Sequence, residues 1–482
     1  MSAHPNILNF VDGELVAPVS GRYFDNVDPA IGKAYANVPD SDKQDLDIAV
    51  AAAKEAFPAW RDTKPETRAS MLVKLAELIE AKLEEFVRAE CVDTGKPVTL
   101  ARSVDIPRGA ANLRAFAEAA LQNFGQTYDK DHAKSYTLRQ PIGVVATISP
   151  WNLPLLLFTW KLAPALAAGN CVIAKPSEVT PMTAYMLSQL INEAGFPKGV
   201  INILHGKGAK IGAAITNHPD ISAISFTGGT TTGIEIYSGA ARQLKKVSLE
   251  LGGKNPTIIF EDADWQKTID GAVAAAFTNQ GQVCLCGSRI LVQAAVYDKF
   301  KEDFLKKVNE IAIGDPLENS TKHGATVSKE HMEKVLSYIE LAKEEGGKVL
   351  AGGKRHMVDG RCKDGYFIEP TVIEGLNQTC RTNQEEIFGP VVTLMPFETE
   401  EEALAIANAT QYGLAASVWT SDEARAKRMA ASIDSGIVWL NCWNLRDLDT
   451  PFGGMKKSGV GREGKQRAME FFTEEKTVTS PT

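Results

Sequence analysis

Three short segments of the sequence carry side chains that could act together on a carbonyl group. Cys284 follows a glycine-containing turn, where exposed backbone amides can stabilise the reactive thiolate form of a cysteine. Glu250 ends a strand-like run in front of two glycines, which suits a general base placed in a tight cleft. Asn152 follows an apolar strand and offers a carboxamide that could donate to an oxyanion. Taken singly, each has a structural alternative, which for Cys284 is an inert buried thiol.

Residues at two further strand ends are candidates for binding a dinucleotide. The segment from Ile224 to Gly233 runs from an apolar strand through Gly228 into a helical stretch, and such a turn exposes backbone amides to a pyrophosphate. Lys175 and Glu178 follow another apolar strand, where they could hydrogen-bond a ribose. A carboxylate there would repel the 2′-phosphate of NADP, which favours NAD, although a solvated charge pair is the alternative.

The sequence also matches G-x-G-x-x-G from Gly459 to Gly464, but the surroundings are wrong for a dinucleotide loop. The match follows two lysines and a serine and not an apolar strand. Only 18 residues remain after it, too few for a βαβ unit. We therefore interpret this match as chance.

An α/β framework must position these groups. Apolar residues recur at helical spacing from about Asp47 to Glu118. Short β-branched runs then alternate with helical segments, which indicates parallel strands joined by crossover helices. Strands are expected over 144–149, 171–174, 200–204, 223–226 and 257–260. A second α/β unit is expected from near Asp264, with helices over 265–277 and 297–311 and a strand over 289–292. The domain boundary is expected near Gly252 and Gly253.

Composition narrows the class of protein. A chain of 482 residues with 44% hydrophobic and 23% charged residues is expected to fold as two or three packed units. Its net charge of -8 comes from interspersed residues and disfavours nucleic-acid binding. The seven cysteines form no paired pattern, which disfavours disulfides and structural zinc and indicates a reducing, cytoplasmic compartment. The uncharged stretch 142–160 is interrupted by two prolines and an asparagine, so we expect a buried strand, a turn and a helix instead of a membrane span.

A series of motifs in fixed order carries a family resemblance. These motifs are Pro150-Trp-Asn152, Lys175-Pro-Ser-Glu178, Phe226-Thr-Gly228 with Gly233, Glu250-Leu-Gly-Gly-Lys254, Asn279-Gln-Gly-Gln-Val-Cys284, Glu386-Ile-Phe388-Gly-Pro390 and Pro451-Phe-Gly-Gly454. Over nearly the whole chain they resemble the motif series of the aldehyde dehydrogenase superfamily. The resemblance implies an α/β fold with a Rossmann-like NAD domain, an α/β catalytic domain and a β oligomerisation arm. The implied bounds are 1–121 and 142–252 for the NAD domain, 253–452 for the catalytic domain, and 122–141 and 468–482 for the arm, with a homodimer or homotetramer as the assembly.

The same resemblance implies a chemistry for individual residues. Cys284 would attack an aldehyde and carry a thioester, with the oxyanion held by the Asn152 amide and the Cys284 backbone N–H. Glu250 would activate the water that hydrolyses the thioester, with no metal. Lys161 and Glu463 are candidates for a proton relay, with purely structural charges as an equal alternative. The residues implied to bind NAD are Ile148, Trp151, Lys175, Glu178, Gly228, Gly233, Leu251, Glu386 and Phe388.

Within the superfamily, the chain is similar to the semialdehyde dehydrogenases of 2-aminomuconic and 2-hydroxymuconic semialdehydes. The similar segments are Asp105-Ile-Pro-Arg108-Gly, Cys284-Leu-Cys286-Gly-Ser-Arg289 and Asn441-Cys-Trp443-Asn-Leu-Arg446-Asp-Leu. The aminomuconic branch, associated with tryptophan breakdown by the kynurenine route, is the closer of the two, and the hydroxy compound is the alternative. No role follows for Cys286 or Asn444.

This branch implies that Arg108 and Arg446 clamp a substrate carboxylate and that Phe452 lines the substrate site. The alternatives are ion pairs, of Arg108 with Asp105 and of Arg446 with Asp447 or Asp449. Each alternative would remove one arginine from the substrate site.

Two other classes of function also fit parts of this pattern. A thiol esterase could use Cys284 and Glu250, but such enzymes normally use a histidine base, and no histidine lies in these motifs. A non-catalytic role would be expected to lack the nucleophile, the base or the carboxamide, and all three are present.

Overall fold

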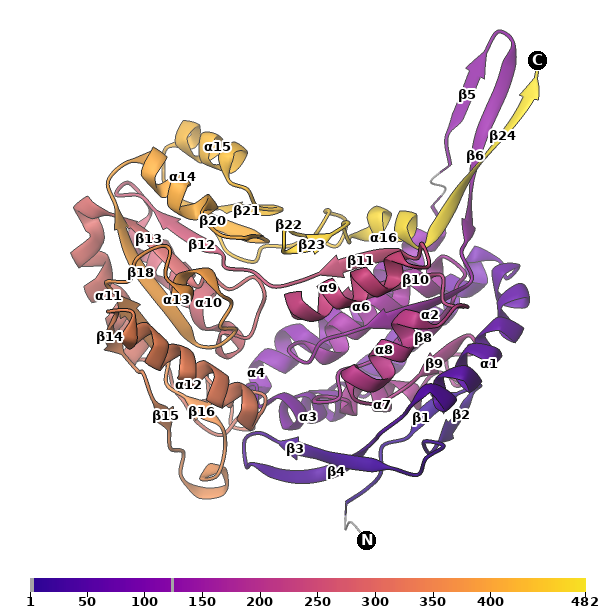
Figure 1. Cartoon of the computed structure of the whole chain (residues 1–482), viewed down its shortest axis with the longest axis horizontal. Helices are drawn as coiled ribbons and strands as arrows, with labels where there is room; N and C mark the ends of the chain where they lie inside the picture. The colour runs from indigo at the N-terminus through magenta and orange to yellow at the C-terminus, as the bar shows by residue number, and fades with distance from the viewer. Residues whose placement is uncertain (1–3, 123–124) are drawn as a thin grey trace.

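The computed structural model describes residues 4–122 and 125–482 and contains two large sheets and a projecting β arm (Figure 1). The first sheet has the strand order β2-β1-β9-β8-β7-β10-β11-β23. Strands β9, β8, β7, β10 and β11 are parallel, whereas β1, β2 and β23 are antiparallel to their neighbours. The bounds are Asn9–Val11 (β1), Glu14–Val16 (β2), Val144–Ile148 (β7), Cys171–Lys175 (β8), Ile201–Ile203 (β9), Ala223–Thr227 (β10), Lys246–Glu250 (β11) and Gly459–Val460 (β23).

Helices surround this first sheet and bury its apolar strands. Strands β7 and β8 are buried along their whole length, as is typical of the central strands of a parallel sheet that is covered on both faces. The helices are Lys43–Arg61 (α1), Pro65–Ala81 (α2), Leu83–Thr94 (α3), Val98–Leu100 (α4), Ile106–Ala120 (α5), Pro154–Ala167 (α6), Met182–Ser188 (α7), Ala213–Asn217 (α8), Thr230–Ala241 (α9) and Lys465–Phe471 (α16), with π-helical turns at Ala101–Asp105 (η1) and Gly208–Gly212 (η2). None of the helices in residues 4–122 and 125–482 is both long and apolar enough to cross a membrane.

The second sheet has the order β14-β17-β18-β13-β12-β20-β21 and is parallel except at β14. Its strands are Pro256–Ile259 (β12), Arg289–Gln293 (β13), Lys348–Ala351 (β14), Thr371–Glu374 (β17), Val391–Phe397 (β18), Ala415–Trp419 (β20) and Ile437–Leu440 (β21). Its helices are Trp265–Phe277 (α10), Tyr297–Asn309 (α11), Lys329–Glu344 (α12), Arg381–Gln384 (α13), Glu400–Asn408 (α14) and Glu423–Ser432 (α15), with 3-10 turns at Thr278–Gly281 (η3), Ala294–Val296 (η4) and Gly360–Cys362 (η5).

Small sheets complete the structure. Strands β5 (Thr127–Lys130), β6 (Ala133–Pro141) and β24 (Thr473–Pro481) form an arm that projects from the body and ends near the carboxyl terminus (Figure 1). The β excursion expected over 122–141 with the last dozen residues is thus present, although positions 123 and 124 lie outside the described residues. The remaining pairs are β3 (Tyr23–Asp28) with β4 (Lys33–Pro39), β15 (Arg355–His356) with β16 (Phe367–Ile368), and β19 (Tyr412–Gly413) with β22 (Met455–Lys456).

The expected strands and helices agree with the structure to within two residues at each end, with one difference in placement. The run 257–260 belongs to β12 of the second sheet and does not continue the first. The chain crosses between the two sheets from Glu250 to Pro256, around the expected boundary at Gly252 and Gly253. The glycine match at 459–464 begins as edge strand β23, antiparallel to β11, so it is no dinucleotide loop.

The carboxyl ends of parallel strands in the first sheet supply the candidate site. Strand β7 leads to Asn152, β8 to Lys175, β10 to Gly228 and β11 to Glu250. Because neighbouring parallel strands end at the same edge of a sheet, these residues lie along one edge, where open α/β sheets bind ligands.

Candidate active site

Cys284 lies in a strained turn that follows α10. Asn279, Gln280 and Gly281 have φ angles of 53°, 56° and 68°. Left-handed backbone is costly for the two residues with side chains, so the surrounding contacts must hold the turn in place. One such contact is the Asn279 amide, whose Nδ2 donates to the backbone oxygen of Asn152 at 3.1 Å. The turn is therefore tied to the strand end that carries the candidate carboxamide.

The Cys284 thiol carries its proton at neutral pH. Burial raises its pKa to about 12, and the carboxyl groups of Glu386 and Glu250 add to that rise while Arg446 opposes it. The carboxyl groups and the partial burial of the thiol thus act against the thiolate that the backbone amides of the turn could stabilise. A base must remove this proton before the sulfur can attack.

Glu250 ends β11 and lines the same cavity as Cys284. Its side chain is buried, and within the described part of the chain neither carboxyl oxygen has a hydrogen-bond partner. Burial and the neighbouring Glu463 raise its pKa well above the usual value, against the opposing charge of Lys161. A buried carboxyl group with free lone pairs is a suitable acceptor for a proton from a thiol or a water molecule.

Asn152 lies between β7 and α6 and faces the nucleophile turn. Its side-chain Nδ2 donates to the backbone oxygen of Gln282 at 2.9 Å, so one of its two amide hydrogens is already used. The other remains for an oxyanion. The backbone N–H of Cys284 donates no hydrogen bond to any described residue and could act beside it.

Lys161 and Glu463 form a buried ion pair next to this group. Lys161 Nζ donates to Glu463 Oε1 at 2.6 Å and to Ser225 Oγ at 3.1 Å. Trp160 Nε1 donates to the other oxygen of Glu463 at 2.6 Å. Glu463 lines the cavity that contains Cys284 and Glu250, so the pair has a position from which it could exchange protons with Glu250.

Three cavities follow one another along the edge of the first sheet. The first, about 410 Å³, shares Leu157, Thr227 and Cys284 with the second, which measures about 210 Å³. The second shares Gly228 and Gly229 with the third, which measures about 610 Å³. The second and third cavities together form one elongated space for a large ligand. Cys284 lies where this space meets the first cavity, which could hold a smaller ligand.

The third cavity holds most of the residues expected to bind the adenosine end of a dinucleotide. Ile148, Trp151, Lys175, Glu178 and Gly228 all line it. Lys175 Nζ donates to Glu178 Oε2 at 2.9 Å, and the backbone N–H of Gly208 donates to Oε1 at 2.8 Å. Although burial alone would raise the pKa of Glu178, Lys175 and this N–H outweigh it and lower the pKa, so the carboxylate is ionised.

The glycines of this cavity permit close packing. A Cβ atom on Gly228 would lie 2.4 Å from the ring of Phe226, and one on Gly233 would lie 2.4 Å from Leu251. A side chain at Gly228 would collide with that ring, and the backbone of Gly228 and Gly229 borders the third cavity just before α9. Gly233 lines none of the three cavities and instead allows Leu251, which lines the second, to pack against α9.

The second cavity brings Trp151, Leu251, Glu386 and Phe388 next to Cys284. Glu386 Oε1 accepts a hydrogen bond of 2.8 Å from the Gly253 backbone. The Phe388 ring packs edge-to-face on Trp151 with their centroids 5.2 Å apart. This small, partly aromatic space is suited to a flat heterocyclic ring beside the sulfur.

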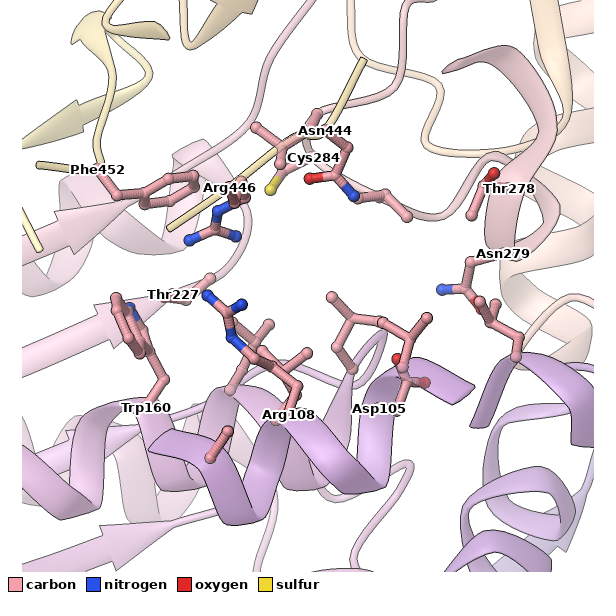
Figure 2. A pocket seen from close by; sticks show the side chains of 18 of the residues that line it. Asp105, Arg108, Trp160, Thr227, Thr278, Asn279, Cys284, Asn444, Arg446 and Phe452 are labelled. Carbon is pink, nitrogen blue, oxygen red and sulfur yellow. The ribbon is translucent and has the colours of Figure 1, made fainter. Parts of the chain in front are cut away.

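The first cavity contains two arginines without an acidic partner. Figure 2 shows the guanidinium groups of Arg108 and Arg446 pointing into it, Arg446 close to Cys284. Within residues 4–122 and 125–482 neither arginine forms an ion pair closer than 4.0 Å. Burial lowers the pKa of Arg446 to about 10, and the charge of Arg108 contributes. The two positive groups are thus close enough to repel each other.

Both alternative ion pairs expected for these arginines are wrong. Asp105 is bonded to Lys96 and not to Arg108. The Arg446 guanidinium lies 4.0 Å from the centre of the Phe452 ring.

The remaining expected partners of Arg446 are also engaged elsewhere or too distant. Asp449 pairs with Lys465 at 2.7 Å. Asp447 forms no ion pair with Arg446, although its charge acts on Arg108.

Comparison with known proteins assigns this geometry to a family. The aldehyde dehydrogenase family matches residues 16–478. A 2-aminomuconic semialdehyde dehydrogenase of Danio rerio is 49% identical over 98% of this chain and 97% of its own length. A 2-hydroxymuconic semialdehyde dehydrogenase of Pseudomonas sp. strain CF600 is 44% identical over 98% of this chain and 99% of its own length. The chain belongs to the aldehyde dehydrogenase family.

A solved structure of this family supports the fold. The betaine aldehyde dehydrogenase of Staphylococcus aureus in complex with NAD⁺ is 38% identical, covers 99% of this chain and 95% of its own, and has a TM-score of 0.96. The expected α/β aldehyde dehydrogenase fold and the expected NAD-dependent aldehyde dehydrogenase class are thus confirmed.

Several residues of this aldehyde dehydrogenase site could not be found from the motifs. His331 and Lys334 of α12 line the second cavity. Leu153, Leu156 and Leu157 give the first cavity an apolar wall. Each lies on a helix or its amino-terminal flank, where its residue type is ordinary, so only the packing of distant elements reveals it.

Proposed function

We propose that this aldehyde dehydrogenase oxidises a semialdehyde that also bears a carboxylate, with 2-aminomuconate 6-semialdehyde as the substrate. The pair Arg108 and Arg446, half-buried in the Cys284 cavity and without an acidic partner among the described residues, carries this proposal. Two unpaired guanidinium groups in a partly apolar cavity call for a negative ligand, and a carboxylate can accept hydrogen bonds from both. The aldehyde of the same molecule would then lie at the sulfur.

NAD fits the two remaining cavities. Glu178, ionised at the end of β8, would accept from a ribose and repel a 2′-phosphate. The exposed backbone before α9 would hold the pyrophosphate, and Glu386 with Phe388 would place the nicotinamide ribose and ring. When bound, NAD supplies the oxidant, which takes up the aldehyde hydrogen with its electron pair.

The protein groups around the aldehyde have separate tasks. Cys284 Sγ forms a bond to the carbonyl carbon as its proton passes to Glu250, whose raised pKa makes it a competent acceptor. The free hydrogen of the Asn152 amide and the Cys284 N–H hold the carbonyl oxygen as it becomes negative.

Oxidation leaves an acyl group on the sulfur, and Glu250 next serves as the base for its hydrolysis. Once the thiol proton has left Glu250 through Glu463, Glu250 takes a proton from a water molecule, whose oxygen attacks the acyl carbon. The bond to sulfur then breaks, the acid leaves, and Glu250 returns its proton to the Cys284 sulfur. The buried pair Lys161 and Glu463 would carry the released proton onward, because Glu463 lines the same cavity.

A hydroxy substituent in place of the amino group is the second candidate substrate. The 44% identity to the Pseudomonas 2-hydroxymuconic semialdehyde dehydrogenase supports it, against 49% for the Danio rerio 2-aminomuconic semialdehyde dehydrogenase. The two arginines would clamp either molecule, so they do not distinguish the two.

The assembly, the compartment and the domain bounds also belong to the proposal. The arm of β5, β6 and β24 offers exposed Tyr128, Tyr136 and Leu138 to a second subunit, which supports a homodimer or homotetramer. Every cysteine is a free thiol, which supports a reducing cytoplasm. The bounds that we propose are 1–121 and 142–252 for the NAD domain, 253–452 for the catalytic domain, and 122–141 and 468–482 for the arm.

A substrate panel followed by NADH absorbance tests this function. The wild type should oxidise both muconic semialdehydes with kcat/KM about 10²-fold higher than propanal or betaine aldehyde, with succinate semialdehyde between them. Arg108→Ala and Arg446→Ala should raise KM for the muconic substrates about 30- to 100-fold and for propanal less than about threefold. Arg114→Ala is the control, because Arg114 lies on α5 as Arg108 does but pairs with Glu80 at the surface. Equal losses on carboxylated and simple aldehydes would refute the clamp.

A further inference from the structure

The backbone oxygen of Asn152 accepts two hydrogen bonds from distant parts of the chain. Lys96 Nζ donates to it at 3.0 Å, and Asn279 Nδ2 donates at 3.1 Å. The Asn279 bond ties Asn152 to the nucleophile turn, and the Lys96 bond ties it to the segment between α3 and α4. The residue that faces the aldehyde oxygen is thus fixed through its main chain from both sides.

Lys96 is a charged side chain with no contact with solvent. Its side chain is fully buried, Nζ donates to Asp105 Oδ2, and Glu90 Oε1 lies 3.6 Å away. Burial opposes the positive charge, but Asp105 and Glu90 outweigh burial and raise the pKa of Lys96. A permanent cation is therefore held in the interior, where it attracts a carbonyl oxygen strongly.

The fold delivers Lys96 to this position through a tight backbone turn. Gly95 ends α3 with a φ of 75°, and its oxygen accepts a hydrogen bond of 2.9 Å from Ala325. A Cβ on Gly324 would lie 1.9 Å from that same oxygen. The segment around Lys96 is consequently held between the end of α3 and the segment at Gly324 and Ala325, which leaves it little freedom to move.

Asp105 links this arrangement to the substrate cavity. It ends the π-helical turn η1 and lines the first cavity, three residues before Arg108 on α5. Irregular π-helical turns of this kind are frequent at functional sites. Lys96 itself lines none of the three cavities, so it reaches neither substrate nor cofactor.

We propose that Lys96 is a positioning residue for the reaction: held by Asp105, it fixes the main chain of Asn152 so that the Asn152 carboxamide meets the aldehyde oxygen. The inference rests on the oxyanion role proposed for Asn152. Loss of Lys96 would leave the Asn152 carbonyl with Asn279 alone, and the carboxamide would lose its fixed direction. The cost should fall on the step in which negative charge develops on oxygen, for every aldehyde alike.

A double-mutant cycle tests this proposal, with Lys96→Met, Asn152→Ala and the double variant. The probes are propanal and 2-hydroxymuconate semialdehyde, and the readout is the rate of NADH formation in the first turnover, beside KM and the affinity for NAD. Lys96→Met should slow the first turnover about 10- to 100-fold on both aldehydes and leave NAD affinity within about twofold. In the Asn152→Ala background, the same change should cost less than about twofold, because both act through one carboxamide.

Two further variants keep the test decisive. If Lys96→Met does not fold, Asp105→Asn removes the partner of Lys96 at constant size and should slow the first turnover about fivefold with the same non-additivity. Lys245→Met removes a partly buried lysine that also donates to a backbone oxygen, that of His218, and should leave the rate unchanged.

The outcomes separate the two proposals. Losses that multiply in the double variant would overturn the positioning role of Lys96 while leaving the oxyanion role of Asn152 intact. An unchanged first-turnover rate in Asn152→Ala would overturn that oxyanion role, and the inference would fall with it.

Discussion

The cofactor cavity and the centre around Cys284 adjoin one another but shift the pKa values of their acidic groups in opposite directions. In the cofactor cavity, Glu178 is paired with Lys175 and receives a backbone N–H, so its pKa lies below the usual value. Around Cys284, burial raises the pKa of both Glu250 and the thiol. Glu178, which only binds, is held in its charged form, whereas Glu250 and Cys284, which exchange protons, are held neutral until the reaction needs them.

The largest effect on activity is expected at Cys284, and the neighbouring Cys286 is its matched control. Cys284→Ala should lower NADH formation at least about 10⁴-fold, because among the described residues Cys284 is the only thiol shared by the first and second cavities. Cys286→Ala should change kcat/KM less than about threefold, since its thiol is buried, its pKa is raised to about 12, and its contact is the Thr278 carbonyl. Steady-state rates and thermal denaturation of both variants measure this. A Cys284→Ala enzyme that retained activity would end the nucleophile assignment.

The opposite pKa shifts predict different pH dependences for catalysis and for binding. Glu250 must be ionised to take the proton of Cys284, and burial raises the pKa of both groups, so activity should be low in acid and increase with pH. We expect kcat/KM to rise up to about tenfold per unit from about pH 6 to about pH 9.

The affinity for NAD should stay level over the same range. Glu178 has a lowered pKa and is already ionised throughout, so no proton leaves it as pH rises. Titration of the intrinsic tryptophan fluorescence with NAD measures this, since Trp151 lines the cofactor cavities. A dissociation constant for NAD that changed in step with kcat/KM would contradict the contrast between the two regions.

The smallest effect is expected from the carboxylate of the cofactor cavity. Glu178→Gln should raise the ratio of kcat/KM for NADP to that for NAD about tenfold, or about 1.4 kcal/mol, by removing the repulsion of the 2′-phosphate. Glu235→Gln is the matched control, because Glu235 lines the same cavity from α9 without standing at a strand end. A similar gain in both variants would mean that the net charge of the cavity, and not Glu178, selects the cofactor.

Hydrophobic patterns and capping residues predict most of the strands and helices, because the features that form these elements lie within each segment. The strand Val144–Ile148 is buried throughout since both faces of a central parallel strand are covered, and α10 begins where expected because Asp264 caps it. The pKa of Cys284 could not be predicted from its turn, because it depends on Glu250, Glu386 and Arg446, which are distant in sequence.

Contacts between distant segments explain the other omissions. The pair of Asp105 with Lys96 could not be distinguished in advance from a pair with Arg108, since both partners are near in the sequence and only the fold selects one. The hydrogen bond from Lys96 to the Asn152 carbonyl joins residues 56 positions apart and leaves no motif. Spacing along the chain reveals what one element does, but not which elements meet.

Trapping the acyl group on Cys284 tests the central claim most directly. Because Glu250 serves as the base in both steps, the test uses the wild-type enzyme, mixed with NAD and 2-aminomuconate semialdehyde and quenched in acid during the first turnover. Intact-protein mass spectrometry should then show one added acyl group. The added mass should equal the aldehyde less two hydrogens, and peptide mapping should place it on Cys284. No adduct, or an adduct on another cysteine, would contradict a mechanism through a Cys284 thioester.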